Sequence, residues 1–155
     1  MGRKLTAVAA LAAAATLVSI AAAGPVATEQ RVSIQSKGGG AFVLTPQTTG
    51  TLKADSGRAT FCCWTTRVIT RDGHRIEVDD PQTTLVGKRG TLVVRNRMEW
   101  LDVAGGYAVF TGTWKVVRGT GDYANVSGAG HVAGITLPSG ETKWQRDGLL
   151  VSKGT

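Results

Sequence analysis

Hydrophobic and polar residues alternate along much of the chain after residue 24, with the two-residue period that a half-buried β-strand produces. In the segment Thr91–Leu101, the apolar side chains of Leu92, Val94 and Trp100 share one face. Arg95 and its charged neighbours take the other face, which indicates a strand with one side in water. No stretch of this region repeats its apolar residues with a helical period. The pattern therefore predicts an all-β protein.

Turns rich in glycine and proline divide this region into short β segments, as in a barrel or a sandwich. The pattern predicts strands at Phe42–Thr45, Arg58–Thr70, Arg75–Asp79, Thr83–Val86, Thr91–Leu101, Tyr107–Arg118, Gly128–Leu137 and Glu141–Ser152, with shorter candidates at Arg31–Gln35 and Thr51–Lys53. Asp72-Gly73 between two β-rich runs predicts a tight hairpin turn, because glycine accepts a positive φ. Roughly seven to nine strands are enough to close a sheet. We therefore expect a single antiparallel β-barrel of about eight strands, with a β-sandwich as the alternative.

The first residues have the composition of a secretory signal peptide. Arg3 and Lys4 form a positive start, Leu5–Ile20 is apolar, and Ala21–Ala23 offers a small-residue cleavage site. The alternative is a membrane anchor, but the apolar run is short for a spanning helix and ends in small residues. We therefore expect a secreted, extracytoplasmic protein with no integral membrane segment once the signal is removed.

Three parts follow from this division of the chain. We expect residues 1–23 to be the signal peptide, residues 24–40 a flexible N-terminal segment, and residues 41–155 the barrel domain. A chain of this length forms one domain and can bury a sizeable core without a metal or a disulfide scaffold.

The formal net charge of the chain is +7, and removal of Arg3 and Lys4 lowers it to +5. The remaining basic residues are scattered, and acidic residues such as Glu77 and Glu99 interrupt them. No dense run of lysine and arginine could follow a track of phosphates, so nucleic acid is not an expected partner. A charged, soluble surface is the plain interpretation, and binding to an anionic cell-wall polymer is the alternative.

The segment Gly112–His131 contains a glycine corner between two β-rich runs. Gly119-Thr120-Gly121 is followed by Tyr123, and small residues return at Gly128 and Gly130. This pattern resembles the "G-T-G-x-aromatic" signature of the allene oxide cyclase and dirigent barrel group. A second, earlier stretch, with Leu52-Lys53, Gly57 and Cys63, is similar to the region where allene oxide cyclases place a cysteine in the barrel lining. The tandem Cys62-Cys63 is not part of the plant pattern.

The resemblance implies an eight-stranded antiparallel barrel with an apolar cavity, often assembled as a trimer. Small exported bacterial members of such a group fit the signal peptide. The plant members steer the cyclisation of a fatty-acid epoxide or the coupling of phenoxy radicals, and they use no metal or organic cofactor. The resemblance thus implies a homotrimer and a cofactor-free barrel that holds the shape of its ligand.

Cys62 and Cys63 are the only cysteines. Adjacent residues on a strand point to opposite faces, and their Cα atoms lie about 3.8 Å apart, which is shorter than the usual disulfide span of roughly 4.4 to 6.8 Å. One buried thiol in the core is the plain interpretation. A strained vicinal bridge and a reactive or intermolecular thiol are the alternatives. If Cys63 points inward, Phe61 does too, and Trp64 then points outward, where another subunit could cover it.

The large aromatic residues of the chain fit either a filled core or the lining of a ligand cavity, since ligand sites are mostly apolar with a few polar groups. A small barrel of about eight strands either fills with side chains or holds one small ligand. The candidate ligand-binding residues are Phe61, Cys63, Trp100, Tyr107 and Trp114.

Other chemistry is weakly indicated. His74 and His131 are far apart and lack metal-ligand spacing, so no metal site is expected. Glu77, Glu99 and Asp147 fall on predicted strands. One of them, pointing inward and desolvated near an arginine such as Arg97 or Arg146, would be a candidate acid or base, but outward ion pairs are the default, and no catalytic residue is assigned.

The sequence therefore predicts an exported barrel that binds a small apolar or phenolic ligand. Two alternatives belong to other classes of protein. One is a cofactor-free isomerase or cyclase that guides a reactive substrate. The other is a cell-surface interaction module that uses the face of Arg95, Arg97 and Lys115.

Overall fold

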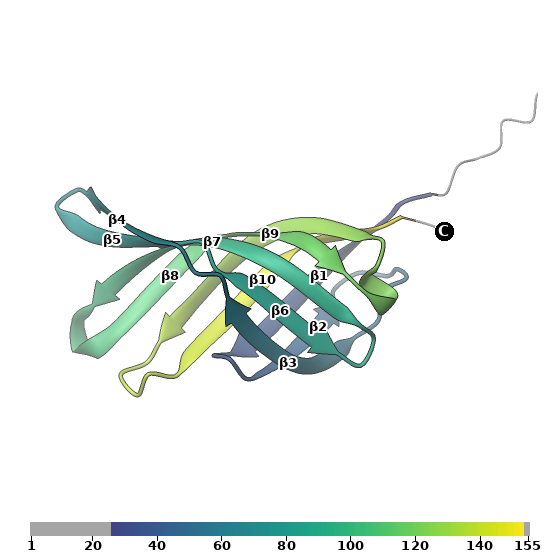
Figure 1. Ribbon diagram of the computed structural model, residues 1–155, viewed down its shortest axis with the longest axis horizontal. Coiled ribbons are helices and arrows are strands. Elements are labelled where there is room, and N and C mark those ends of the chain that lie inside the picture. The colour runs from purple at the N-terminus through teal and green to yellow at the C-terminus, as the bar shows by residue number, and fades with distance from the viewer. Residues whose placement is uncertain (1–25, 154–155) are drawn as a thin grey trace, which may run out of the picture.

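The computed structural model describes residues 26–153, which form ten β-strands and two short 3-10 turns (Figure 1). The strands are β1 (Thr28–Lys37), β2 (Ala41–Pro46), β3 (Asp55–Cys62), β4 (Thr66–Arg71), β5 (His74–Asp79), β6 (Gln82–Gly87), β7 (Thr91–Val103), β8 (Tyr107–Gly119), β9 (Val126–Thr136) and β10 (Thr142–Ser152), with turns η1 (Ala104–Gly106) and η2 (Gly121–Tyr123). The expected signal peptide, residues 1–23, lies outside the described residues.

Eight of these strands form a closed ring. The strands β7, β6, β3, β2, β1, β10, β9 and β8 pair in that order, and β8 pairs again with β7. Every pairing is antiparallel. The predicted single antiparallel barrel of about eight strands is confirmed, and the β-sandwich alternative is wrong because the sheet closes on itself.

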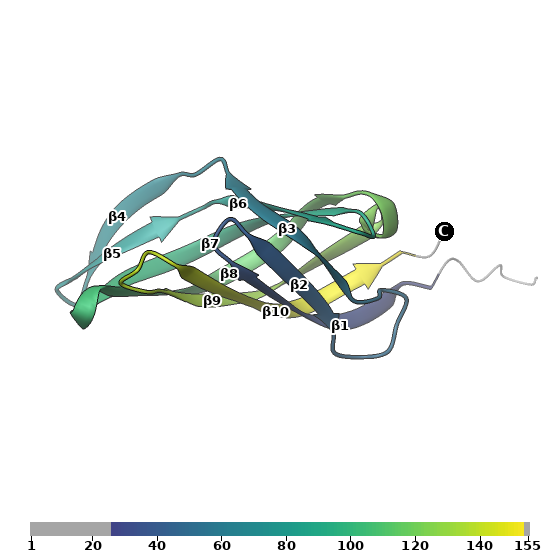
Figure 2. The same cartoon turned by 90° about the horizontal axis from the view of Figure 1, so that it is seen from below.

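The strands β4 and β5 lie outside this ring. They form a hairpin that stands clear of β8 and β9 in Figure 1 and reaches past the barrel wall in Figure 2. The single strand predicted at Arg58–Thr70 is therefore wrong: β3 ends at Cys62, and β4 begins at Thr66. Cys63 has a φ of 57°, which interrupts the extended backbone. Between β5 and β6 lies Pro81, which has no N–H group to donate to a neighbouring strand.

The turn at the tip of this hairpin follows the prediction. Asp72 and Gly73 both have positive φ, at 52° and 78°. Arg71 pairs with His74 on either side of them. Two positive φ angles match the twist of the flanking strands, which is why Asp-Gly favours this turn.

Two predictions about the first part of the chain are corrected. Residues 24–40 were expected to be flexible and to precede the barrel, but β1 pairs along its whole length with β10, from Thr28 opposite Ser152 to Lys37 opposite Lys143. It also pairs with β2, so the barrel begins at Thr28. The candidate strand at Thr51–Lys53 is instead part of the loop between β2 and β3.

The barrel interior is filled by one apolar core to which all eight ring strands contribute. Inward glycines make room for the larger rings. A Cβ atom on Gly148 would lie 2.7 Å from Cζ2 of Trp114, and one on Gly134 would lie 2.7 Å from Cε1 of Phe110. The large rings of β8 therefore lie over glycines of the adjacent strand β9 and of β10 beyond it, and these glycines set where the rings sit.

The glycine corner closes one end of the barrel. Gly121 has a φ of 60°, and the η2 turn that starts there brings Tyr123 into the core, where it is 2 % exposed. The Tyr123 hydroxyl donates a hydrogen bond to Oδ2 of Asp55 (3.0 Å). Asp55 also accepts from the backbone N–H groups of Lys88 (3.0 Å) and Arg89 (3.3 Å). The corner thus joins β8 to β3 and to the β6–β7 turn.

Removal of the Tyr123 hydroxyl should destabilise the fold. We expect Tyr123→Phe to lower the free energy of unfolding by about 1.5–3 kcal/mol, because the bond to a buried carboxylate is lost. The control is Tyr107→Phe, since Tyr107 is 40 % exposed. Urea denaturation of both variants checks this, and equal midpoints would show that the Asp55 contact contributes nothing.

Addition of one methyl group at an inward glycine should also be costly. Gly148→Ala forces the Trp114 ring and the neighbouring backbone to move, and we expect a loss of about 1–3 kcal/mol. Gly39→Ala is the control, because a Cβ atom there meets nothing within 4 Å. Thermal unfolding distinguishes the two, and an unchanged Gly148→Ala melting temperature would contradict the tight interior.

Candidate functional site

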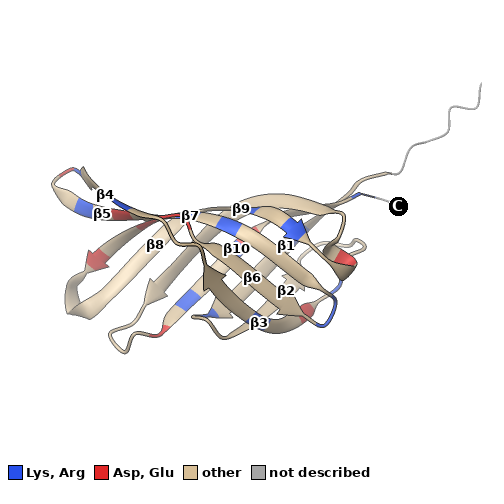
Figure 3. Ribbon diagram, in the orientation of Figure 1, with Lys and Arg blue, Asp and Glu red and all other residues tan. Residues whose placement is uncertain are grey.

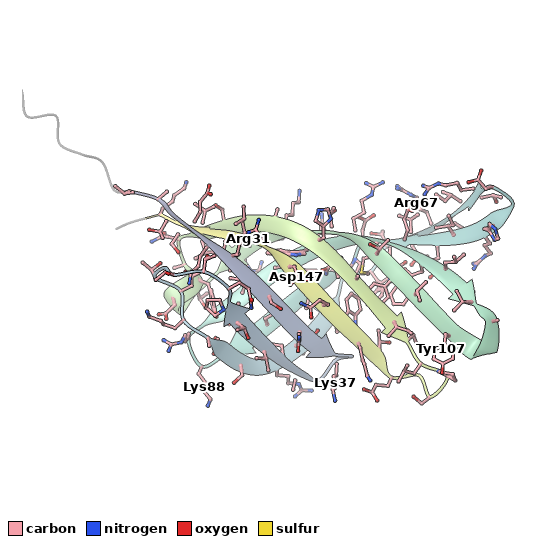
Figure 4. All side chains as sticks on the ribbon, turned by 180° about the vertical axis from the view of Figure 1, so that it is seen from behind. Arg31, Lys37, Arg67, Lys88, Tyr107 and Asp147 are labelled. Carbon is pink, nitrogen blue, oxygen red and sulfur yellow. The ribbon has the colours of Figure 1, made fainter. Side chains whose placement is uncertain are left out.

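The barrel wall is incomplete at the end from which the β4–β5 hairpin extends, and we call this end the open end. The β2–β3 ladder stops at the pair Ala41 and Arg58. Beyond it, Thr60–Cys62 pair with β6 alone, so the wall between β3 and β1 is interrupted. In Figure 4, Lys37 and Tyr107 lie toward this open end, whereas Arg31 and Lys88 lie toward the other.

Five aromatic side chains gather at this opening, and we call them the aromatic cluster: Phe61, Trp64, Trp100, Phe110 and Trp144. Phe61 stacks on Trp144 with ring centroids 4.8 Å apart. Phe110 lies 4.5 Å from Trp144 and 4.1 Å from Trp100. Trp64 extends the cluster to the surface, 6.2 Å from Phe61 and 47 % exposed. The cluster thus leads from solvent into the barrel.

Two indole N–H groups of the cluster lack a hydrogen-bond partner within the described residues. Nε1 of Trp100 and Nε1 of Trp144 are both buried, and neither finds a hydrogen-bond acceptor within residues 26–153. Trp144 is only 5 % exposed. Buried N–H groups are nearly always paired, since an orphan forfeits its bond to water. These two donors therefore mark a place where an external acceptor would be favoured.

A buried polar group lies directly beneath the cluster, and we call it the polar cluster: Arg146, Asn96, Thr83 and Ser36. Nε of Arg146 donates to Oδ1 of Asn96 (2.9 Å), and its Nη atoms donate to Oγ of Ser36 (3.3 Å) and Oγ1 of Thr83 (3.1 Å). Nδ2 of Asn96 donates to Oγ1 of Thr83 (2.9 Å) and the carbonyl of Pro81 (3.3 Å). The guanidinium carbon lies 4.9 Å from the centroid of the Trp144 ring.

Arg146 is fully buried, with 0 % exposure, and burial lowers its pKa to about 10. At neutral pH the guanidinium therefore still carries its charge. Its three acceptors are neutral oxygens, and none of the ion pairs found in the described part of the chain includes it. A buried cation without a counter-ion is costly, so its presence here requires an explanation.

The outer wall carries grooves that border the aromatic cluster. One, of about 520 Å³, crosses β2, β1, β10 and β9, and its lining includes Val43, Ile135 and Trp144. Another, of about 330 Å³, lies over β7 and β8, and Trp100 and Phe110 contribute to it. Three members of the cluster, Trp144, Trp100 and Phe110, thus border two surface depressions.

The structure places the five predicted lining residues in different environments. Phe61 and Trp100 join the aromatic cluster. Trp114 points inward and is 2 % exposed, but it donates from Nε1 to the carbonyl of His131 (3.0 Å) and is a core residue. Tyr107 is exposed at the tip of β8. The candidate lining residue Cys63 does not point inward: it is exposed because the chain leaves the strand conformation there.

Cys62 and Cys63 are free thiols, and both are exposed. Neither is the buried core thiol that the sequence favoured. The pKa of Cys62 is raised, first because Cys63 hydrogen-bonds to its neutral form, and second because of desolvation. Nε2 of Gln82 donates to Sγ of Cys62 (3.7 Å). Trp64, in the connection between β3 and β4, is 47 % exposed.

Both thiols should react in the folded protein. We expect iodoacetamide to alkylate Cys62 and Cys63 without denaturant, as measured by intact mass. Cys63→Ala should speed alkylation of Cys62 at pH 8, because the hydrogen-bonding side chain that raises the pKa of Cys62 is removed and the thiolate is the nucleophile. Resistance to alkylation, with a mass lower by two hydrogens, would instead show a vicinal disulfide.

The carboxylates considered as an acid or base do not enter the site. Glu99 pairs with Arg71 (2.8 Å) on the surface, and this contact lowers the pKa of Glu99. Glu77 pairs with Arg75 (3.6 Å), and Asp147 accepts from Gln145 (2.8 Å). Asp79 is instead buried and accepts a hydrogen bond from Thr66 (2.6 Å), at the base of the β4–β5 hairpin. No cluster of three or more potential metal ligands occurs among residues 26–153.

Sequence reasoning missed the polar cluster. Arg146 shares the inward face of β10 with Trp144 and Leu150. Asn96 shares the inward face of β7 with Val94 and Met98. This parity was the available signal, but charged and amide side chains are by default assigned to the outer face.

Comparison of the chain with protein-family models, with curated proteins and with solved structures gave no match. The described residues contain no helix with the length and apolar character that a membrane crossing requires.

Proposed function

We propose that this barrel binds a small apolar or phenolic molecule at its open end, within the aromatic cluster. The rings of Phe61, Trp100 and Trp144 supply an apolar surface that reaches from the core to solvent. Aromatic rings stack favourably on one another, and small-molecule sites combine such surfaces with a few well-placed polar groups.

The observation that carries this proposal is the pair of unpaired indole N–H groups. Trp100 and Trp144 hold their Nε1 donors in buried positions that no acceptor within the described chain satisfies. A phenolic or carbonyl oxygen of a ligand would accept from either donor and remove the penalty. A core that only stabilised the barrel would gain by pairing them or by using phenylalanine instead.

The alternative of a surface interaction module is supported by a separate groove of about 580 Å³. Arg95, Arg97, Lys115 and His131 line it, together with Asp80. Figure 3 shows basic segments on several strands and acidic ones between them, so the charge is not confined to this groove. Binding of an anionic polymer there is our second proposal.

The alternative of an isomerase or cyclase needs an acid or base beside the ligand. Among the described residues the buried carboxylates are Asp55 and Asp79. Asp55 is engaged by Tyr123 and backbone N–H groups at the closed end, and Asp79 is engaged by Thr66. The form of this alternative that fits the site is a barrel that holds a reactive substrate in the productive shape without an acid or a base.

Three further expectations remain proposals. Export and extracytoplasmic location rest on the composition of residues 1–23. A relation to the allene oxide cyclase and dirigent group rests on the corner at Gly119–Tyr123 and is supported by an eight-stranded antiparallel ring. A homotrimer is supported by the exposed Trp64 and by the apolar groove over β1, β2, β9 and β10.

Calorimetric titration with 2-naphthol and with naphthalene tests the binding site. We expect saturable binding of both, with 2-naphthol the tighter ligand. Trp144→Phe and Trp100→Phe keep a ring but remove the N–H donor, so at least one of them should weaken 2-naphthol binding about tenfold, as loss of roughly 1.4 kcal/mol implies. Naphthalene, which has no acceptor, should bind these variants as it binds the wild type.

Trp114→Phe is the matched control, because its Nε1 already donates to the carbonyl of His131. It should lower stability and leave the affinity for 2-naphthol unchanged. Absence of saturable binding by either compound, or an equal loss in all three variants, would contradict the proposed site.

A further inference from the structure

The buried charge of Arg146 narrows the class of ligand, and this inference rests on the proposed function. The guanidinium lies beneath the Trp144 ring, in the barrel interior, with only neutral oxygens as partners. An arginine used only for structure would be expected to face a carboxylate or to reach solvent. Here the described chain offers it neither.

The guanidinium also has unused donors. Arginine carries five N–H bonds, and three of them are used by Asn96, Ser36 and Thr83. Nη1 and Nη2 each have one hydrogen bond within the described residues, so each keeps one further N–H group. A planar guanidinium matches the oxygens of a carboxylate, as it does those of a phosphate.

The polar cluster fixes this cation in place. Asn96 accepts from Nε and is itself held by its backbone N–H, which donates to the carbonyl of Pro81 (2.9 Å). Ser36 comes from β1 and Thr83 from β6, so the guanidinium is held from opposite walls of the barrel. Such preorganisation is what an ion-pairing group needs if it is to add affinity.

We propose that the ligand of the aromatic cluster is an aromatic carboxylate, and that its carboxylate pairs with the guanidinium of Arg146. The distances limit the size of the ligand. Cζ of Arg146 lies 4.9 Å from the Trp144 centroid, and the Phe61 and Phe110 rings lie 4.8 Å and 4.5 Å from that same ring. The acid must therefore sit on the aromatic ring or within a few bonds of it.

Entry of this carboxylate requires displacement of the rings above Arg146, because the guanidinium is fully buried. Phe61 is the side chain placed to allow it. It lies in the part of β3 that pairs only with β6, two residues before the backbone turns at Cys63. The Phe61–Trp144 stack is thus bordered by the interrupted wall rather than by a complete sheet.

The test compares two ligands of nearly equal shape, 2-naphthoate and the neutral 2-acetylnaphthalene, by calorimetry at pH 7. We expect the wild type to bind 2-naphthoate at least tenfold more tightly. Arg146→Met should abolish this preference and leave the affinity for 2-acetylnaphthalene within about twofold. Arg118→Met removes the same charge from an exposed site outside the grooves described above and should keep the preference, which excludes a general effect of net charge.

A second variant tests the preference for 2-naphthoate by adding a negative charge instead of removing the positive one. Asn96→Asp places a carboxylate next to Nε of Arg146, where Oδ1 now accepts at 2.9 Å. It should abolish the preference for 2-naphthoate, because the cation then has an internal counter-ion, and it should raise the melting temperature of the ligand-free protein. This variant carries the test if Arg146→Met does not fold.

The outcomes separate the two proposals. Binding of both ligands by the wild type with equal affinity would overturn the carboxylate inference and leave the aromatic site intact. Binding of neither ligand would overturn the aromatic site and the inference with it. A preference that survives in Arg146→Met and in Asn96→Asp would show that another group recognises the anion. In wild-type protein labelled with ¹⁵N-arginine, 2-naphthoate and not 2-acetylnaphthalene should shift one Nε–H resonance.

Discussion

The pairing of β7 with β8 is the constraint on which the rest of the molecule depends. Without it the ten strands would form one open sheet from β4 to β8, and with it eight of them enclose an interior. Closure fixes which side chains meet, since every second residue of each strand must fit the same limited volume. The inward glycines of β9 and β10, such as Gly134 and Gly148, leave the space that Phe110 and Trp114 fill. The large aromatic side chains fit inside this barrel only because glycines stand at these positions.

The two ends of the barrel use buried polar residues in opposite ways. At the closed end, the carboxylate of Asp55 is surrounded by donors, from Tyr123 and from backbone N–H groups. At the open end, the guanidinium of Arg146 has neutral acceptors, and the indole of Trp144 has none within the described chain. The first arrangement is complete and stabilises the fold. In the second arrangement, the charge of Arg146 has no counter-ion and the indole N–H of Trp144 has no acceptor within the described residues. Both groups lie beside the aromatic rings that reach solvent.

Much of the architecture was predictable because alternation and turn chemistry are local signals. The β7 pattern, the Asp72-Gly73 turn and the ring closure all followed from the sequence. The break at Cys63 was not predictable, because a run of Thr, Cys, Trp and Val favours a continuous strand and the left-handed residue depends on how the hairpin leaves the wall. For the site, Trp100 shares the apolar parity of Leu92 and Val94, whereas the inward position of Phe61 was tied to Cys63, which is exposed. The inward position of Arg146 was not predicted, because the cost of burying a charge argues against an inward position until its partners are seen.

The outer margin of the β4–β5 hairpin has a consequence for assembly. Within the described sheet, β4 has a neighbour only on its β5 side, so its other side presents backbone donors and acceptors to solvent. Exposed sheet margins of this kind invite a strand from another molecule. Arg67 lies on this strand and is exposed, and two copies aligned there would bring this cation close to its counterpart. Like charges at such a margin disfavour the pairing of two identical copies.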